Sequence, residues 1–293
     1  MTGDAITSTH TVPVPVGQQP TSRSVNARPT GSVARLLLAQ IVAEVRRNLR
    51  APEYMIVVVA LPVLLFAMFG LAETGNILPR GTDVGAVLFA SLTAYGVISL
   101  AIFTFGVDVA QERGSGWLRR LRVTPMPLWV YLTGKVAMAI VYAAAIVLAV
   151  LAVAAFAGGI AFTVDRALRT ALVVMSGAVA FSTMGFALAF WARPRAATAI
   201  GNLIFMPLAF TSGLFYSLNG IPTVLQDIAP FLPTYHFGQL AWNQIAPVAD
   251  VVAFGSPEPE SLLVHAAWVA GSFVVFGLVA VVGYRRDVRR SYR

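Results

Sequence analysis

Six long apolar runs, separated by short polar or basic segments, limit what this chain can fold into. A helix that crosses a hydrocarbon core of about 30 Å needs roughly twenty apolar residues, and each run is about that long or longer. Hydrophobic residues make up 57% of the chain and charged residues only 12%. We therefore predict an all-α membrane protein and not a pair of soluble domains. The six predicted spans are residues 54–72, 84–107, 130–156, 168–191, 198–218 and 262–284.

The distribution of basic residues predicts the orientation of these spans. Eighteen of the 21 Lys and Arg residues fall before the first span, between the second and third, between the fourth and fifth, or after the sixth, with Lys135 near the start of the third span counted among them. The three others are Arg80, Arg166 and Arg169. Basic segments concentrate on the cytoplasmic side of membranes, so both termini are predicted to be cytoplasmic. The net charge of +8 then reflects topology and does not indicate a nucleic-acid partner.

Outside the predicted transmembrane domain, residues 53–286, three segments have distinct compositions. Residues 1–31 are rich in Thr, Ser, Pro and Val and are predicted to be a disordered cytoplasmic tail. Residues 32–52 are predicted to be an amphipathic interfacial helix, with a helix packed on a soluble partner as the alternative. Residues 287–293 form a basic cytoplasmic tail. The apolar arc of the amphipathic helix contains Leu37, Leu38, Ile41, Val42, Val45 and Leu49, and its polar arc contains Arg35, Glu44, Arg46, Arg47 and Arg50.

The stretch from Asp108 to Lys135 separates the second and third runs and contains most of the charges between them. Acidic residues at its start and arginines further along complement a helix dipole, while Gly114 and Gly116 allow a bend. These features predict a short helix along the membrane surface; an ordinary basic loop is the alternative. Its expected apolar face consists of Trp117, Leu118 and Leu121.

The longest outer connection, residues 219–261, is also not simply polar. An apolar series from Ile221 to Leu232 is interrupted by prolines, and Trp242 follows. We predict two short re-entrant helices that pack on the outer side of the bundle, because irregular backbone at that depth must be covered by protein. A surface loop anchored through Trp242 is the alternative.

The sequence lacks the motifs of several enzyme and nucleotide-binding classes. The chain has no cysteine, and it contains no G-x-x-x-x-G-K-[ST] phosphate loop, no H-E-x-x-H and no G-x-S-x-G. The central parts of the spans have almost no ionisable residue, which disfavours an ion-coupled carrier. The three histidines, His10, His236 and His265, are far apart in sequence and predict no metal site. We expect neither an enzyme nor a bound cofactor.

Two stretches resemble a known family. QERGSGWLRRLRVTPMP followed by YLTGK resembles the first cytoplasmic loop of type-2 ABC transporter permeases of the drug-export branch. The segment from Phe205 to Ile245, FMPLAFTSGLFYSLNGIPTVLQDIAPFLPTYHFGQLAWNQI, resembles the fifth span and the outer loop of that family. With the pattern of spans, the resemblance covers roughly residues 35–290.

The resemblance implies a two-fold dimer of permeases in a bacterial plasma membrane, with a second copy or a paralogue as partner. A separate ATPase subunit, holding ATP and magnesium, would dock on a coupling helix. The implied substrate is an amphipathic small molecule, and membrane lipids surround the spans. A lipid or polysaccharide exporter, or a non-transporting anchor or sensor, stays open. The implied coupling residues are Gln111, Glu112, Arg113, Gly114, Gly116, Trp117, Arg119, Arg120 and Arg122.

In that family the second and fifth spans face the translocation path, and short outer helices resemble a lid over the exit. The spans offer neutral polar groups that suit such a path, although Ser and Thr also join membrane helices to one another. The candidate path residues are Ser91, Tyr95, Ser99, Asn202, Thr211 and Ser212. The candidate lid residues are Phe231, Tyr235 and Trp242.

Overall fold

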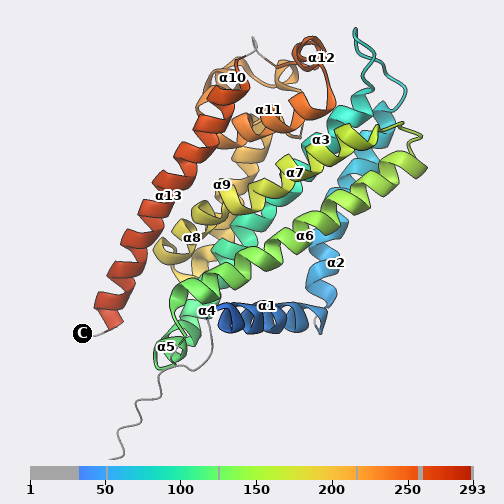
Figure 1. The fold of residues 1–293 in the computed structure, drawn as a ribbon. Helices are drawn as coiled ribbons and strands as arrows, with labels where there is room; N and C mark the ends of the chain where they lie inside the picture. The colour runs from blue at the N-terminus through green and yellow to red at the C-terminus, as the bar shows by residue number, and fades with distance from the viewer. Residues whose placement is uncertain (1–32, 51, 125, 216, 257–259, 292–293) are drawn as a thin grey trace, which may run out of the picture.

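The fold is an elongated bundle of helices (Figure 1). The computed structural model describes residues 33–50, 52–124, 126–215, 217–256 and 260–291. Within these ranges the backbone is helical apart from short connections and an isolated β-bridge between Ile77 and Asp83. The predicted tail at residues 1–31 lies outside the described residues. The all-helical class is therefore confirmed for the part of the chain that is described.

Four helical stretches within the described ranges are long and apolar enough to cross a membrane. They are Val84–Gly114, Leu128–Phe156, Val164–Trp191 and Leu262–Arg289. A fifth apolar stretch, Val58–Glu73, is shorter. These helices support a membrane-embedded protein, and the number of six spans stays a prediction.

The helical stretch Val84–Gly114, which we call the second stretch because it contains the second predicted span, extends further than the sequence predicts. It consists of α3 (Val84–Leu100), a π-helical segment (Ala101–Asp108) and α4 (Val109–Gly114), which follow one another without a break. The helix stops only where Gly116 adopts φ 79°, a left-handed conformation that favours glycine. The predicted surface helix beginning near Asp108 is therefore wrong in its start, and the short helix α5 comprises only Trp117–Arg122.

The predicted span at residues 198–218 ends early. Helix α9 runs from Ala197 to Thr211, and Gly213 adopts φ 73° directly after it. A left-handed glycine at this place terminates a helix by turning the chain. At 1.5 Å per residue, the 15 residues of α9 extend about 22 Å, less than the thickness of a hydrocarbon core.

The remaining long helices pack against α3, against the π-helical segment that follows it, or against one another. They are α2 (Pro52–Leu65), α6 (Leu128–Phe156), α7 (Val164–Ala180), α8 (Ser182–Trp191) and α13 (Leu262–Ser291). Helix α3 is almost completely buried, whereas α13 exposes most of its apolar surface. Pro62 of α2 packs directly on Gly96 of α3, where an added Cβ would lie 2.7 Å from the proline Cγ. The core of the bundle is therefore built around α3.

Helix α1 (Val33–Leu49) lies across one end of the bundle and packs on α6 (Figure 1). The amphipathic helix is thus present, and one residue, Glu44, departs from its predicted arc. Leu38 and Val42 are exposed, whereas Glu44, assigned to the polar arc, is buried. Its position against α6 explains this, because Glu44 finds a cation there. Helices α1 and α5 and the C-terminal end of α13 all lie at this end of the bundle.

The opposite end is covered by short helices that we call the outer cap. They are the 3-10 turns Leu218–Gly220 and Ala229–Phe231 and the helices α10 (Thr223–Ile228), α11 (Pro233–Ile245) and α12 (Val248–Ala253). Helix α11 is the buried member and packs against α3, α7 and α13. The short outer helices are therefore present, while their depth in a membrane stays a prediction.

Asp250 of α12 fastens the outer cap to the connection between α2 and α3. Its side chain is fully buried and accepts hydrogen bonds from the backbone N–H groups of Arg80, at 2.6 Å, and Thr82, at 3.1 Å. Burial alone would raise the pKa of this carboxyl, but the hydrogen bonds from Thr82 and Arg80 favour the charged form and hold the pKa below its usual value.

We expect Asp250→Asn to lower the free energy of unfolding by about 1–3 kcal/mol, because two backbone N–H donors lose a charged acceptor. The control is Asp227→Asn, at an exposed position of α10. The stabilisation from Asp250 is present above the unfolded pKa of about 4 and is lost as pH falls through the lower folded value. Thermal unfolding in detergent, followed against pH, tests both points. Equal effects of the two substitutions would contradict this role.

Candidate functional site

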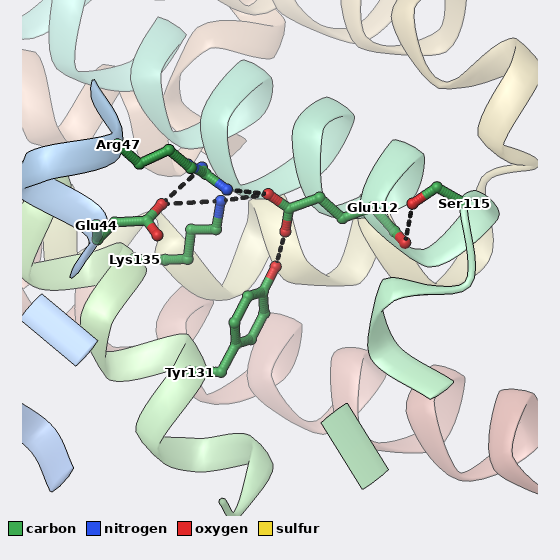
Figure 2. Close-up of polar contacts among 6 residues, drawn as sticks. All are labelled: Glu44, Arg47, Glu112, Ser115, Tyr131 and Lys135. Atoms are coloured by element: carbon green, nitrogen blue, oxygen red, sulfur yellow. Dashed lines mark hydrogen bonds and ion pairs between the residues drawn. The ribbon is translucent and has the colours of Figure 1, made fainter. Parts of the chain in front are cut away.

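Three helices bring charged side chains together at the end of the bundle that carries α5. Glu44 and Arg47 come from α1, Glu112 from α4, and Tyr131 and Lys135 from α6 (Figure 2). We call these five residues the charge cluster. They belong to segments up to 91 positions apart in the sequence, so the cluster exists only in the folded chain.

Lys135 lies at the centre of the charge cluster. Its ammonium Nζ is 2.8 Å from Glu112 Oε1 and 3.1 Å from Glu44 Oε1, and its side chain is only 1% exposed. An isolated ammonium at such a position would be strongly unfavourable. Two carboxylates therefore have to accompany it, and they come from two different helices.

Arg47 and Tyr131 complete the hydrogen bonding of these carboxylates. The Arg47 guanidinium donates to Glu44 at 2.7 Å and to Glu112 at 2.9 Å, and the Tyr131 hydroxyl donates to the second oxygen of Glu112 (Figure 2). The cluster holds two cations and two anions and is neutral overall. Arg47 is half exposed, so the cluster is closed on the α6 side and accessible to solvent on the α1 side.

Arg113, which follows Glu112 in the chain, makes a second set of contacts on another side of α4. The Arg113 guanidinium donates to the backbone carbonyls of Phe190, at 2.8 Å, and Ala192, and its Nη1 atom lies 3.5 Å from the Asp287 carboxylate. The two carbonyls lie at the C-terminus of α8, where helices leave carbonyls without intrahelical partners. Glu112 and Arg113 therefore connect the end of α4 to α1, α6, α8 and α13.

A tight turn leads from this junction into α5. Ser115 Oγ donates to the Glu112 carbonyl at 2.9 Å (Figure 2), and Gly116 supplies the left-handed residue. Gly114 lies against Pro194, where an added Cβ would approach the proline Cβ to 2.6 Å. Both glycines are therefore needed for steric reasons, one by close approach and one by its φ angle.

Helix α5 divides into a buried and an exposed side. Leu118 and Leu121 pack into the main core, whereas Trp117 is 45% exposed and Arg119 and Arg120 are exposed. The predicted apolar face is thus wrong in placing Trp117 with the two leucines. Trp117 lies about 100° around the helix from Leu118 but only about 40° from Leu121, so it is at the edge of the buried side and stays partly exposed. The side chain of Arg122 lies outside the described residues.

The structure separates the coupling residues implied by the sequence into two groups. Gln111, Glu112, Arg113 and Gly114 belong to the last turn of the long second stretch, and the others follow Gly116 in α5. Sequence reasoning missed the residues that accompany Glu112 in the charge cluster, which are Glu44, Arg47, Tyr131 and Lys135. One signal was available, since Lys135 is the only lysine of the chain and stands in an otherwise apolar run.

Most of the candidate path residues are buried in contacts within the chain. Ser91 accepts a hydrogen bond from Trp242 Nε1 at 2.7 Å, Ser212 contacts Thr234, and both serines are completely buried. Thr211 is also buried. Asn202 instead lies on the exposed side of α9.

Two other path candidates lie on α3. Tyr95 is buried and packs its ring on Phe205 and Phe215, and Ser99 donates to the Gly96 carbonyl at 2.7 Å. These contacts lie within one chain and account for the burial of the side chains without a ligand.

The candidate lid residues also differ from one another. Phe231 is 69% exposed, whereas Tyr235 and Trp242 are buried. Trp242 connects the outer cap to α3 through its hydrogen bond with Ser91. An apolar exposed lid surface is therefore limited to Phe231 among these three.

Two histidines that are far apart in sequence meet in the structure. His236 of α11 and His265 of α13 lie with their Nδ1 atoms 2.7 Å apart, close to the Glu260 carboxylate. The argument from sequence distance against such a cluster was therefore wrong for these two residues.

Comparisons with known proteins identify relatives over most of the chain. The family described as ABC-2 type transporter matches residues 35–243. A protein named putative transport permease YvfS, from Bacillus subtilis strain 168, is 27% identical over 235 residues, which cover 80% of this chain and 92% of the relative. A probable multidrug ABC transporter permease, YbhR of Escherichia coli K12, is 28% identical over 182 residues. That match covers 57% of this chain and 48% of YbhR, so the chain aligns with only about half of that relative.

We expect Lys135→Met to destabilise the fold by about 3–5 kcal/mol, because Glu44 and Glu112 lose the cation that compensates their burial. The double variant Lys135→Met, Glu112→Gln should recover part of this loss, since one uncompensated carboxylate is removed. Chemical unfolding in detergent measures both, and Arg120→Met at an exposed position is the control. A double variant less stable than Lys135→Met alone would contradict the assigned pairing.

Proposed function

The chain belongs to the ABC-2 type transporter family, and we propose that it is the membrane-spanning permease subunit of an ATP-driven exporter. The observation that carries this proposal is an exposed basic helix, α5, attached to a junction of four further helices. Families of this type work with an ATPase subunit. That separate subunit would hold ATP and magnesium, and this chain would perform no bond chemistry itself.

Helix α5 is the proposed docking element. Its buried leucines, Leu118 and Leu121, attach it to the bundle, while Trp117, Arg119 and Arg120 face outward. Aromatic and arginine side chains are the residues that most often dominate binding at protein interfaces. The exposed arginines favour an acidic groove on the ATPase, because complementary charge guides association.

The junction behind α5 provides the route for coupling. Glu112 contacts α1 and α6, and Arg113 contacts α8 and α13. When a displacement of α5 moves α4, the contacts of Glu112 and of Arg113 are therefore affected at the same time, and either both sets persist or both break. The ATPase would drive export by binding differently to two arrangements of this junction, since only differential contact shifts a conformational equilibrium.

The proposed location is a bacterial plasma membrane with both termini in the cytoplasm. The end that carries α1, α5 and the C-terminal part of α13 (Figure 1) also carries most of the basic residues, which supports a cytoplasmic position for it. The outer cap would then face outside.

An amphipathic or hydrophobic small molecule is the proposed substrate class. The few polar groups of α3 are occupied by contacts within the chain, and YbhR carries the word multidrug in its name. Export of a lipid or polysaccharide by a permease of the same fold is a second candidate function, and a non-transporting membrane anchor is a third. ATP-dependent movement of substrate in reconstituted vesicles separates the anchor from the two exporters.

The exposed side of α9 is the proposed contact between two permease subunits. Asn202 lies there with Met206 and Phe210 at helical spacing, beside Leu203. An amide in an apolar membrane surface gains from a partner on another helix. A second copy, placed across a two-fold axis, would offer the same amide, and a path between subunits would pass Asn202.

For coupling, we expect Arg119→Glu, Arg120→Glu to abolish ATP-dependent transport and copurification of the ATPase while thermal stability is unchanged, because both side chains are exposed. The matched control is Arg169→Glu, an exposed arginine near the opposite end of the bundle. Normal transport by the α5 variant would overturn docking through this helix.

For the dimer, the absence of cysteine allows a single cysteine to report on neighbours. We expect Asn202→Cys to form a disulfide-linked dimer on oxidation in membranes, because two-fold symmetry places equivalent residues opposite each other. The control is Val275→Cys, on the exposed side of α13. Equal cross-linking at both positions would rule out a specific contact through α9.

A further inference from the structure

Three side chains with metal-binding chemistry converge where the outer cap meets α13. His236 comes from α11, His265 from the first turn of α13, and Glu260 from the residues just before it. The Glu260 Oε2 atom lies 3.9 Å from His236 Nδ1 and 3.8 Å from His265 Nδ1. All three potential ligand atoms lie within 4.8 Å of one another, a spacing that one ion can bridge.

Hydrogen bonding fixes the His236 ring in the form that a metal ligand requires. Its Nε2 lies 2.8 Å from the Pro230 carbonyl and must donate, because a carbonyl only accepts. Nδ1 of the neutral ring therefore carries the lone pair. Metal-binding histidines commonly donate their other N–H to a backbone carbonyl in this way.

The surroundings hold the ligands in place and leave an entrance. Trp268 stacks on the His236 ring at 4.9 Å between centroids and 11° between planes. Both histidines are buried, whereas the Glu260 side chain is 47% exposed. An ion can therefore arrive through the carboxylate side, while the imidazoles stay packed.

We propose that His236, His265 and Glu260 bind a divalent transition-metal ion of the Zn²⁺ type. Two imidazole nitrogens and one carboxylate oxygen form a known zinc ligand set that leaves a fourth position for water. Imidazole disfavours Mg²⁺ and Ca²⁺, which prefer oxygen ligands. This site is independent of the exporter proposal, because it rests on groups at the opposite end of the bundle from α5.

Binding requires two small adjustments within the site. In the hydrogen-bonded pair, His265 Nδ1–H donates to His236 Nδ1, so His265 must carry its proton on Nε2 when Nδ1 binds the ion. Zinc–nitrogen distances of about 2.0–2.1 Å place two tetrahedral ligands about 3.3 Å apart, so the rings separate by roughly half an ångström. The bound ion would connect α11 to α13 and so fix the outer cap to the last helix.

The test is a Zn²⁺ titration of the full-length chain, purified in detergent without a histidine tag. We expect one Zn²⁺ ion per chain, a rise in unfolding temperature on binding, and no saturable binding of Mg²⁺. Replacing a ligand should weaken affinity more than the 10–100-fold typical of outer-shell changes, so His236→Gln and His265→Gln should each lose about 100-fold or more. Glu260→Gln should lose at least roughly 10-fold, since an amide oxygen is a weaker ligand.

The matched control is His10→Gln, which changes the third histidine of the chain and should leave Zn²⁺ affinity unchanged. Variants that fold, judged by their unfolding temperature without metal, and bind Zn²⁺ as the native chain does would overturn the proposal. X-ray absorption of the Zn²⁺-loaded native chain gives an answer that needs no variant. Two imidazole nitrogens with oxygen ligands are expected, and a shell without imidazole, or no saturable Zn²⁺ binding, would also overturn it.

Discussion

The burial of Lys135 is the constraint on which the arrangement at the α5 end depends. An ammonium group enclosed by an apolar bundle requires compensating charge and hydrogen-bond acceptors, and α6 supplies no carboxylate of its own near it. Glu44 and Glu112 come from α1 and α4 and meet this need. The position of α1 across the end of the bundle and the continuation of the second stretch to Gly114 both follow, because each brings one carboxylate to the same nitrogen.

Such a cluster is a poor source of stability compared with apolar packing of the same volume, since desolvation offsets most of the attraction between the charges. Its effect is on specificity. A buried ion pair has few acceptable geometries, so it restricts how the helices that contribute to it can be arranged. The adjacent Glu112 and Arg113 thus fix α4 relative to the bundle on two sides, while α5 stays accessible beyond the turn at Gly116.

The sequence predicts the apolar helices well because long uncharged runs have few alternatives in a membrane. It predicts ends and faces less well, because these depend on single contacts. The helical stretch Val84–Gly114 is longer than the predicted span because Glu112 and Arg113 look like loop residues until their partners on other helices are known. Glu44 fits a polar arc by periodicity, yet tertiary contact with Lys135 buries it.

The pairing of His236 with His265 depends on how α11 folds back on α13, which no local pattern encodes. Ser91 and Ser212 suit a path by composition, but their partners are Trp242 and Thr234 of α11.

The π-helical segment Ala101–Asp108 lies between the enclosed α3 and the junction at Glu112 and Arg113. A π-helical turn holds more residues than an α-helical turn and is commonly found as an insertion within longer helices. Rewinding of this segment into regular α-helix would rotate α4 about its axis, turning the two charged side chains away from their partners at the same time. The ion pairs of Glu112 and Arg113 would therefore oppose this rewinding. If they broke, α4 could rotate while α3 kept its position.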